Sequence, residues 1–335
     1  MRRLAALVIA PVLLLAAACG SEGEDETTAT ASSSPSASAS TAPVPELVEL
    51  AADAPTPTVE GEPGEKPTIS VPDAQPDGNF SYKVLTEGDG EAVQDGDYVT
   101  FQLAGFNWTT AQEMEGSTYE TGGAQTTQIG ASAQQQVIPA LGQPMLGQPV
   151  GSRVLVVAPP TATWGTNGNE QLGVAPGDTM VFVLDIVDRI PSTGGAEGEM
   201  AESEAGMPTV TMGDAGPQIT VPEGEEPPTE LRQQVLIEGD GPVVEAGQQL
   251  VAQYTGALWS DGSVFDSSWE RGSAATFGIG SGQVIAGWDE ALVGKKAGDR
   301  VLLVIPPDKA YGDQENNGIP ANSTLVFVVD ILGSF

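Results

Sequence analysis

The chain contains two copies of one sequence pattern, and this duplication restricts it to a fold that a repeated domain can build. The matching segments are residues 84–90 (VLTEGDG) and 235–241 (VLIEGDG), 151–155 (GSRVL) and 298–302 (GDRVL), and 180–185 (MVFVLD) and 325–330 (LVFVVD). Gly105 and Trp108 of the first copy return as Gly256 and Trp259. A period of this length indicates duplication of a whole domain rather than a solenoid of short repeats.

Each copy is rich in strand patterns. In the second copy, residues 249–258 alternate in polarity, so that Leu250 and Tyr254 point to the same face of a strand. Residues 299–305 and 324–332 are β-branched runs bounded by glycine and proline, which is typical of strands. We therefore expect both copies to be built mainly on β-sheet.

One segment of the second copy has a convincing helical period. Ile285, Trp288 and Leu292 are spaced so that they share one face of a helix over about residues 285–293. A sheet with one buried face that closes over a single short helix is an α+β arrangement. The sequence therefore predicts an α+β fold for each copy.

Composition separates the two copies from the rest of the chain. No Lys or Arg occurs between Arg3 and Lys66, and this stretch is rich in Ser, Ala, Thr, Glu and Pro, so it cannot bury enough apolar surface to offset its ordering entropy. A second acidic stretch with Gly and Pro follows the first copy, and its later part, near residues 218–222, is expected to form a leading strand of the second copy. The expected segments are a disordered acidic tether at 20–65, a first domain at 66–190, an acidic linker at 191–215 and a second domain at 216–335.

The N-terminus has the pattern of an export signal. Arg2 and Arg3 precede an apolar run that is too short to span a bilayer as a helix. The run ends at residues 15–18 (LAAA), directly before the only cysteine, Cys19. This ending resembles a bacterial lipobox, which implies that residues 1–19 direct lipidation of Cys19 and anchor the protein to the outer face of the cell membrane. The alternative is an ordinary signal peptide with an incidental cysteine.

The charge and the missing residue types exclude several classes of function. The 335 residues include 12 basic and 46 acidic side chains, giving a net charge of −34, which repels nucleic acid and anionic lipid. With no histidine and one cysteine, Ser-His-Asp and Cys-His catalysis, His-ligated zinc and internal disulfides are excluded. We therefore expect no metal and no cofactor.

A set of motifs in residues 231–335 points to a specific family. In order, they are Tyr254-Thr255-Gly256, Phe265-Asp266-Ser267-Ser268, Val284-Ile285-Ala286-Gly287-Trp288, Ala310-Tyr311-Gly312 and Thr324-Leu325-Val326-Phe327. This ordered set resembles the FKBP-type peptidyl-prolyl isomerases. The resemblance implies two FKBP-like domains, each an antiparallel β-sheet wrapped around one short α-helix, with a proline-binding pocket between sheet and helix.

The resemblance also implies a role for each matching residue. Trp288 would form the pocket floor, and the walls would be Tyr254, Phe265, Phe277, Val284, Ile285 and Phe327. Asp266 would accept hydrogen bonds within the site and pair with Arg271. Tyr311 and the backbone N–H of Ile285 would donate to the substrate carbonyl, and Ile319 would lie in a flap over the pocket.

Such a site fits the chemistry of proline isomerisation. Rotation about an Xaa-Pro bond makes no new bond and requires only loss of amide resonance, with a barrier of about 18–20 kcal/mol. A dry apolar pocket disfavours the charge separation of the planar amide, and a hydrogen-bond donor holds the displaced carbonyl. Taken singly, Trp288 or Phe327 would more often be a core residue, and Asp266 a turn residue.

Three departures from the family pattern bear on substrate preference. Ala275 stands where the family often has an aromatic residue at the pocket edge, and Gln283 replaces a common acidic residue. The flap at 313–319 is one residue shorter than usual and carries one isoleucine where two are common.

The first copy aligns well over its framework and poorly over its site. Leu103 stands at the position of Tyr254, Leu141 at Trp288 and Trp164 at Tyr311. The pair Phe265-Asp266 falls near residues 114–116 (MEG), and Thr121 replaces Arg271. We expect a degenerate domain that keeps the fold without the chemistry and serves as a spacer, binding surface or clamp, the alternative being a divergent but active isomerase.

The expected function is therefore peptidyl-prolyl cis–trans isomerisation by the second domain. Its partners would be proline-containing segments of exported or unfolded proteins, and the protein would be a monomer. The alternative is a non-catalytic surface chaperone or protein-binding scaffold. A solute receptor is disfavoured, because two small domains joined by one linker lack a shared hinged cleft.

Overall fold

A computed structural model describes residues 44–121, 123–130 and 137–335. The predicted signal segment, the lipidated Cys19 and the first part of the tether lie outside the described residues. Within the described ranges, no helix combines the length and the apolar character needed to cross a membrane.

The second copy is built on one antiparallel sheet with strand order β12-β16-β17-β13-β14, and β15 also pairs with β13. The strands are β12 (Arg232–Ile237), β13 (Gln249–Leu258), β14 (Val264–Ser267), β15 (Ala275–Gly278), β16 (Arg300–Ile305) and β17 (Leu325–Ser334). The runs expected to be strands at 249–258, 299–305 and 324–332 correspond to β13, β16 and β17.

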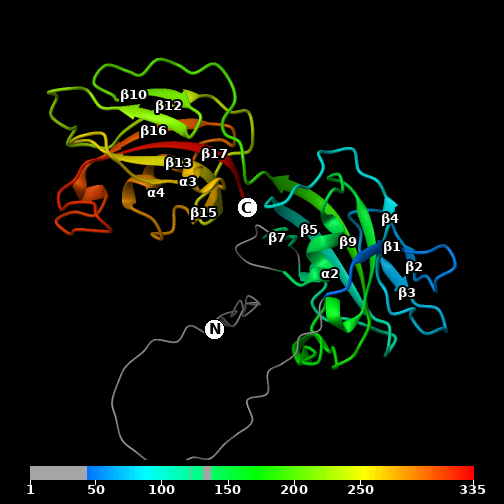
Figure 1. The fold of residues 1–335 in the computed structure, drawn as a ribbon. Helices are drawn as coiled ribbons and strands as arrows, with labels where there is room; N and C mark the ends of the chain where they lie inside the picture. The colour runs from blue at the N-terminus through cyan, green and yellow to red at the C-terminus, as the bar shows by residue number, and fades with distance from the viewer. Residues whose placement is uncertain (1–43, 122, 131–136) are drawn as a thin grey trace, which may run out of the picture. The chain divides into compact units, whose positions relative to one another are not determined.

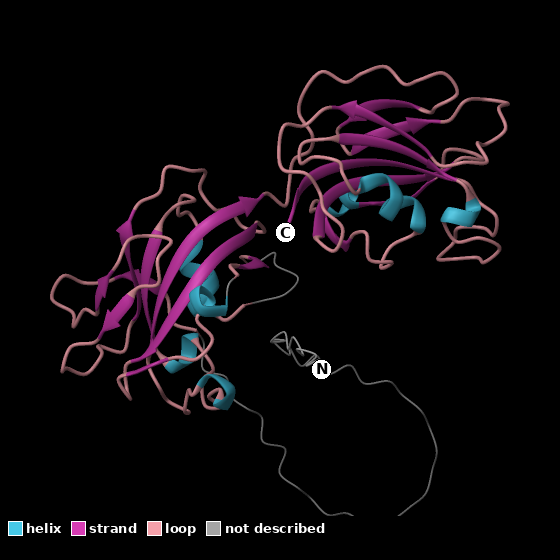
Figure 2. Cartoon of the chain, turned by 180° about the vertical axis from the view of Figure 1, so that it is seen from behind, coloured by secondary structure: helices cyan, strands magenta, loops and turns pink. Residues whose placement is uncertain are grey.

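A short helix covers one face of this sheet. The helix expected over 285–293 runs as α4 (Ala286–Leu292) and lies against the sheet in Figures 1 and 2. Two shorter helical turns flank it, α3 (Ser268–Arg271) and η4 (Pro307–Lys309). Alternation along the strands sends Leu250, Tyr254 and Leu303 into the core beneath α4. The α+β prediction is confirmed.

A hairpin covers the opposite face of the sheet, which we call the outer face. It consists of β10 (Thr209–Gly213) and β11 (Gly216–Thr220), which pair antiparallel. Val210 packs there against Leu302, Val304 and Val328, the side chains that alternate with those of the helix-covered core. The leading strand expected near residues 218–222 is thus β11, and β10 lies within the stretch assigned to the linker.

The first copy repeats this plan with strand order β1-β4-β8-β9-β5-β6, and β7 also pairs with β5. Its sheet strands are β1 (Leu47–Glu49), β4 (Phe80–Thr86), β5 (Tyr98–Asn107), β6 (Gln112–Glu113), β7 (Gln125–Gln128), β8 (Arg153–Ala158) and β9 (Met180–Ile190). The helical segments are α1 (Thr118–Thr121), α2 (Pro139–Gly142), η1 (Gln143–Met145), η2 (Pro160–Ala162) and η3 (Glu170–Leu172). A hairpin of β2 (Thr58–Glu60) and β3 (Thr68–Ser70) covers its outer face.

The structure differs from the composition-based tether in residues 44–65. These residues contribute β1, which pairs in parallel with β4, and β2, which pairs with β3. The physical reason is that apolar side chains are present at the spacing a strand requires: Val59 and Ile69 pack on the outer face beside Leu155 and Val181. A low content of aromatic and basic residues concealed these short strands.

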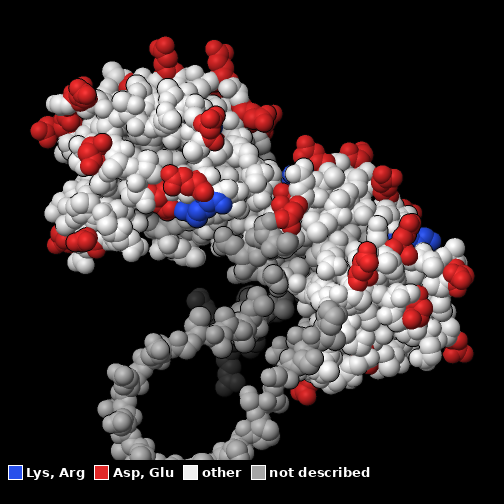
Figure 3. All heavy atoms as spheres, in the orientation of Figure 1, with Lys and Arg blue, Asp and Glu red and all other residues white. Residues whose placement is uncertain are grey.

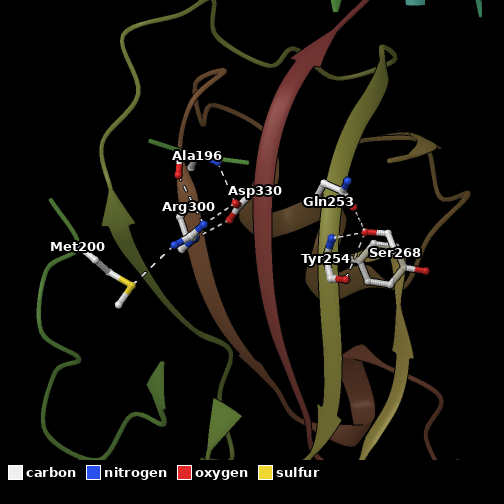
Figure 4. A network of polar contacts seen from close by, with 7 residues as sticks. All are labelled: Ala196, Met200, Gln253, Tyr254, Ser268, Arg300 and Asp330. Atoms are coloured by element: carbon white, nitrogen blue, oxygen red, sulfur yellow. Dashed lines mark hydrogen bonds and ion pairs between the residues drawn. The ribbon is translucent and has the colours of Figure 1, made fainter. Parts of the chain in front are cut away.

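Each outer face also holds a buried ion pair at the same place in the repeat. Arg153 Nε donates to Asp185 Oδ1 at 2.6 Å, and Arg300 Nε donates to Asp330 Oδ1 at 2.7 Å (Figure 4). All four side chains are at most 5% exposed. Among the charged side chains on the face shown in Figure 3, acidic ones clearly outnumber basic ones.

Candidate functional site

The predicted aromatic residues come from separate elements of the second copy and meet between sheet and helix. Tyr254 lies on β13, Phe265 on β14, Phe277 on β15, Trp288 on α4 and Phe327 on β17. All five belong to or pack against the same apolar cluster. Strand alternation explains this meeting, because Tyr254 and Phe327 both point to the helix-covered face.

The rings contact one another edge to face around Trp288. Ring centroids are 4.8 Å apart for Phe277 and Trp288, 5.3 Å for Trp288 and Phe327, and 5.6 Å for Tyr254 and Trp288. Phe265 extends the cluster through Phe327 at 5.6 Å. Edge-to-face pairs of this kind are favoured by the ring quadrupoles. Trp288 is therefore held at the centre of the cluster.

The cluster is buried at its centre and partly exposed at its edge. Trp288 is 3% exposed, Phe327 5% and Tyr254 7%, whereas Phe265 and Phe277 are half-buried. The further residues predicted for the site lie at this edge: Val284, Ile285 and Tyr311 are half-buried and Ile319 is buried, and all pack against the cluster. The arrangement can contact an apolar ring from several sides.

One glycine makes the close packing possible. A Cβ atom on Gly256 would lie 2.7 Å from Phe265 Cζ and 2.7 Å from Phe327 Cε1. Real Cβ atoms do not approach other carbons so closely, so any other residue at this position would displace both rings.

A polar group of three side chains borders the aromatic cluster. The hydroxyl of Tyr254 and Nη1 of Arg271 both donate to the carboxylate of Asp266, and Nη2 of Arg271 donates to the Tyr254 hydroxyl at 2.8 Å. The Arg271 guanidinium also lies 5.5 Å from the centre of the Tyr254 ring. These contacts fix the orientation of Tyr254.

The same contacts shift the ionisation of the group. Burial, followed by the hydrogen bond to Asp266, raises the pKa of Tyr254 to about 12. Burial acts to raise the pKa of Asp266, but the hydrogen bonds from Tyr254 and Arg271 outweigh it, and this pKa is lowered. Asp266 is therefore an anion and Tyr254 a neutral donor at neutral pH.

Two hydrogen-bond donors at the edge of the cluster have no acceptor among the described residues. They are the hydroxyl of Tyr311 and the backbone N–H of Ile285, the residue that precedes α4. Burial and then the charge of Asp266 raise the pKa of Tyr311, which keeps its hydroxyl protonated. Both donors are free to bind a carbonyl oxygen of a ligand.

One residue of the site was not identified from the sequence. Asp289 follows Trp288 on α4, and its carboxylate accepts from the backbone N–H of Gly280 at 2.6 Å and of Gly282 at 2.8 Å. These bonds hold the loop that leads into Val284 and Ile285. The signal was an acidic residue in the first turn of the helix, following a glycine-rich loop, a common N-terminal arrangement that is easily read as structural.

The first copy fills the same region with its own side chains. Leu103 is 6% exposed and Met114 5% exposed, and a Cβ on Gly105 would lie 2.5 Å from Met114 Cε. Trp164 packs edge to face on Phe182, with ring centroids 6.5 Å apart. Phe182 itself is fully buried. No carboxylate–arginine pair like that of Asp266 and Arg271 borders this cluster in the described residues.

The described residues contain no group of three or more His, Cys, Asp or Glu side chains that could hold a metal ion. The aromatic cluster can bind an apolar ring, and the two free donors at its edge can donate to a carbonyl oxygen of the same ligand.

Comparison with known proteins agrees with the duplication. The family model for "FKBP-type peptidyl-prolyl cis-trans isomerase" matches residues 89–187 and again residues 241–332. Among curated proteins, an FK506-binding protein of Streptomyces anulatus is 45% identical over 118 residues, covering 35% of this chain and 94% of the relative. A probable FK506-binding protein of Corynebacterium glutamicum is 35% identical over 118 residues, covering 35% of this chain and 98% of the relative.

Among solved structures, FkpA from Escherichia coli is 36% identical, with 39% of this chain and 53% of that chain covered and a TM-score of 0.30. AtFKBP13 is also 36% identical, with 32% of this chain and 96% of that chain covered and a TM-score of 0.30.

Proposed function

Because the chain belongs to the FKBP-type peptidyl-prolyl cis-trans isomerase family, matched in both copies, we propose that its second copy catalyses rotation about Xaa-Pro bonds. The observation that carries this proposal is the aromatic cluster around Trp288 with two free donors at its edge. Catalysis of this rotation requires tighter binding of the twisted amide than of the planar one.

The roles of the residues follow from their positions. The proline ring packs on Trp288, between Tyr254 and Phe327, where water is excluded. Loss of amide resonance reduces the partial negative charge on oxygen and the partial positive charge on nitrogen. A dry site therefore favours the twisted state over the more polar planar state. The Ile285 N–H and the Tyr311 hydroxyl hold the carbonyl as it turns, and no proton is transferred.

The group of Asp266, Arg271 and Tyr254 positions one wall of the site. Its carboxylate is fully engaged by the hydroxyl and the guanidinium, so it acts as an acceptor that orients Tyr254 rather than as a base. Phe265, Phe277, Val284 and Ile319 complete the apolar surface on which the residue before proline rests.

The test is an isomerisation assay on the full chain with a set of Xaa-Pro tetrapeptides. We expect acceleration above the uncatalysed rate, and we expect Trp288→Leu to remove most of it. Rates equal to buffer for every peptide would contradict the isomerase and leave a non-catalytic chaperone or scaffold as the function. A circular dichroism spectrum unchanged by Trp288→Leu controls for folding.

The location and partners are part of the same proposal. Lipidation of Cys19 would anchor the protein at the outer face of the cell membrane, where its substrates would be exported or unfolded polypeptides, and it would act as a monomer. Cys19→Ser should move the protein from the membrane fraction to the soluble fraction. Retention of this variant in the membrane would exclude the acyl anchor.

A further inference from the structure

The outer face of the second copy carries an open cavity that the isomerase site does not use. The cavity has a volume of about 430 Å³. Its walls include Trp269 of α3, Arg300 of β16, Ile237 of β12, Met212 of the covering hairpin and Met200 of the segment before it. Arg300 lies on the face of the sheet opposite to Trp288, so this cavity is separate from the aromatic cluster.

Two buried donors belong to side chains that line this cavity and lack good acceptors among the described residues. Arg300 is 3% exposed, and its Nη1 reaches only the thioether sulfur of Met200, at 3.9 Å (Figure 4). Its Nη2 is bound by Asp330 and is 3.5 Å from the carbonyl of Ala196. The indole Nε1 of Trp269 is buried with no partner. A thioether is a weak acceptor, and unpaired buried donors are costly, so the cavity is short of acceptors.

The first copy shows what fills the equivalent position. There Arg153 Nη1 donates to the carbonyl of Gly61 at 2.7 Å, and Nη2 donates to the carbonyl of Glu65 at 2.8 Å. Both carbonyls belong to the loop between β2 and β3. In this copy the guanidinium is thus satisfied by the backbone of a peptide segment.

A difference between the two covering hairpins explains why the second guanidinium is not satisfied. In the first copy, β2 and β3 stop pairing at Glu60 and Thr68, and the loop between them turns onto Arg153. In the second copy, β10 and β11 pair as far as Gly213 and Gly216. Among the described contacts of Arg300, the acceptors are Asp330, Met200 and Ala196, and no carbonyl of this tight hairpin is one of them.

We propose that this cavity binds an extended segment of another polypeptide, whose backbone carbonyl accepts from Arg300 and Trp269 and whose apolar side chain packs on Met200, Met212 and Ile237. Asp330 already neutralises the charge of Arg300, so a neutral carbonyl fits better than an anion. Methionine side chains adapt to varied apolar partners.

Charge selects the flanks of the segment. Glu197 lines the cavity, and the chain carries a net charge of −34. Basic residues beside the apolar side chain are therefore favoured, and acidic ones are repelled. This cavity requires no proline in the segment that it binds. It would therefore hold an unfolded polypeptide independently of the isomerase site.

The test uses the full chain and a fluorescein-labelled, proline-free peptide, Lys-Val-Leu-Val-Thr-Lys, followed by fluorescence anisotropy. We expect saturable binding, weaker binding of the matched peptide with glutamate at both ends, and about fivefold loss of affinity in Trp269→Phe, which removes one neutral donor and keeps a ring. Met212→Ser removes an exposed apolar wall and should also weaken binding. Trp288→Leu is the matched control and should bind as the wild type does.

The rate of isomerisation of a short Xaa-Pro peptide distinguishes this proposal from the proposed isomerase function. Trp269→Phe and Met212→Ser should keep that rate, which also shows that they fold. The proposal for this cavity is refuted if the wild type does not bind the peptide up to about 1 mM. It is also refuted if neither variant weakens binding, or if Trp288→Leu abolishes binding. Self-association of the wild type that is lost in Trp269→Phe would likewise refute it, because a second copy of the chain would then be the occupant.

Discussion

The two copies keep the same buried ion pair on the outer face of the sheet and differ most on the inner, helix-covered face. Both bury an arginine–aspartate pair against the sheet, and both use a hydroxyl at the start of a short helix to accept from a backbone N–H: Thr118 from Leu103 and Ser268 from Tyr254. On the inner face, Trp288 and Tyr254 of the second copy are matched by Leu141 and Leu103. The framework therefore does not depend on the residues that give the site its chemistry.

The largest expected effect tests the shared framework. Arg300→Met leaves Asp330 charged and buried, and Arg153→Met does the same to Asp185, so each should lower the free energy of unfolding of its own copy by about 3–5 kcal/mol. Chemical denaturation followed by circular dichroism measures this loss. The matched control is Arg232→Met, because Arg232 pairs with Glu204 at the surface and should change stability by less than about 1 kcal/mol.

Equal and small losses for all three variants would show that the buried pairs do not support the fold. A large loss for only one of the two buried arginines would show that the copies differ in their framework as well as in their sites.

The next largest effect is expected from a substitution that gives the second copy a residue of the first. Trp288→Leu places the residue of Leu141 at the centre of the aromatic cluster and removes contacts with Phe277 and Phe327. We expect kcat/KM for a Leu-Pro peptide to fall at least about tenfold, or ~1.4 kcal/mol. Residual activity near the wild-type level would mean that the first copy, or another surface, catalyses the reaction.

The reverse change should not create a site. Leu141→Trp adds a ring to the first copy, but in the same cluster Met114 already packs close to Gly105 and Trp164 packs on Phe182. A chain that combines Trp288→Leu with Leu141→Trp should therefore remain as inactive as Trp288→Leu alone.

The fold of the second copy was predictable because each local pattern agreed with the global one. Alternation along β13 and helical spacing at Ile285, Trp288 and Leu292 predict that these side chains share one core, and the structure places them there. The site needed more, because periodicity cannot bring Phe265 and Phe277 to Trp288 from other strands. That grouping came only from the resemblance to a family.

Three of the four strands in the covering hairpins, β2, β3 and β10, were missed for a different reason, whereas β11 corresponds to the leading strand expected near residues 218–222. Residues 57–60 (PTVE) and 67–72 (PTISVP) of the first copy return as 208–211 (PTVT) and 217–222 (PQITVP), so the repeat extends into segments taken as tether and linker. Strands this short, flanked by Gly, Pro and Glu, have little local signal. These strands are ordered by packing on a sheet formed by later residues. Local amino-acid composition gives no sign of that packing.

A smaller effect concerns pH. The pKa of Asp266 is lowered in the folded state, so the stability it contributes is present above its unfolded pKa of about 3.9 and is lost as pH falls through the folded value. Tyr254 titrates only near 12. We expect kcat/KM to be constant between about pH 5 and 9 and to fall only in stronger acid.

A pH–rate profile of the wild type and of Asp266→Asn measures this. The variant should be slower and should lack the acid decline, because no carboxylate remains beside Tyr254 and Arg271. An activity change centred near neutral pH would contradict the assignment, since no group of the site titrates there.

The smallest effect distinguishes positioning from surface charge on α4. Asp289→Ala frees the N–H groups of Gly280 and Gly282, so the loop before Ile285 should become mobile and kcat/KM should fall about threefold, with little change in unfolding free energy. Its neighbour Glu290 pairs only with Lys309 and is exposed, so Glu290→Ala should be neutral. Because Asp289→Asn can still accept one of the two hydrogen bonds, it should recover part of the rate. Equal effects of Asp289→Ala and Glu290→Ala would assign the loss to the charge of the helix, not to the loop that presents the Ile285 donor.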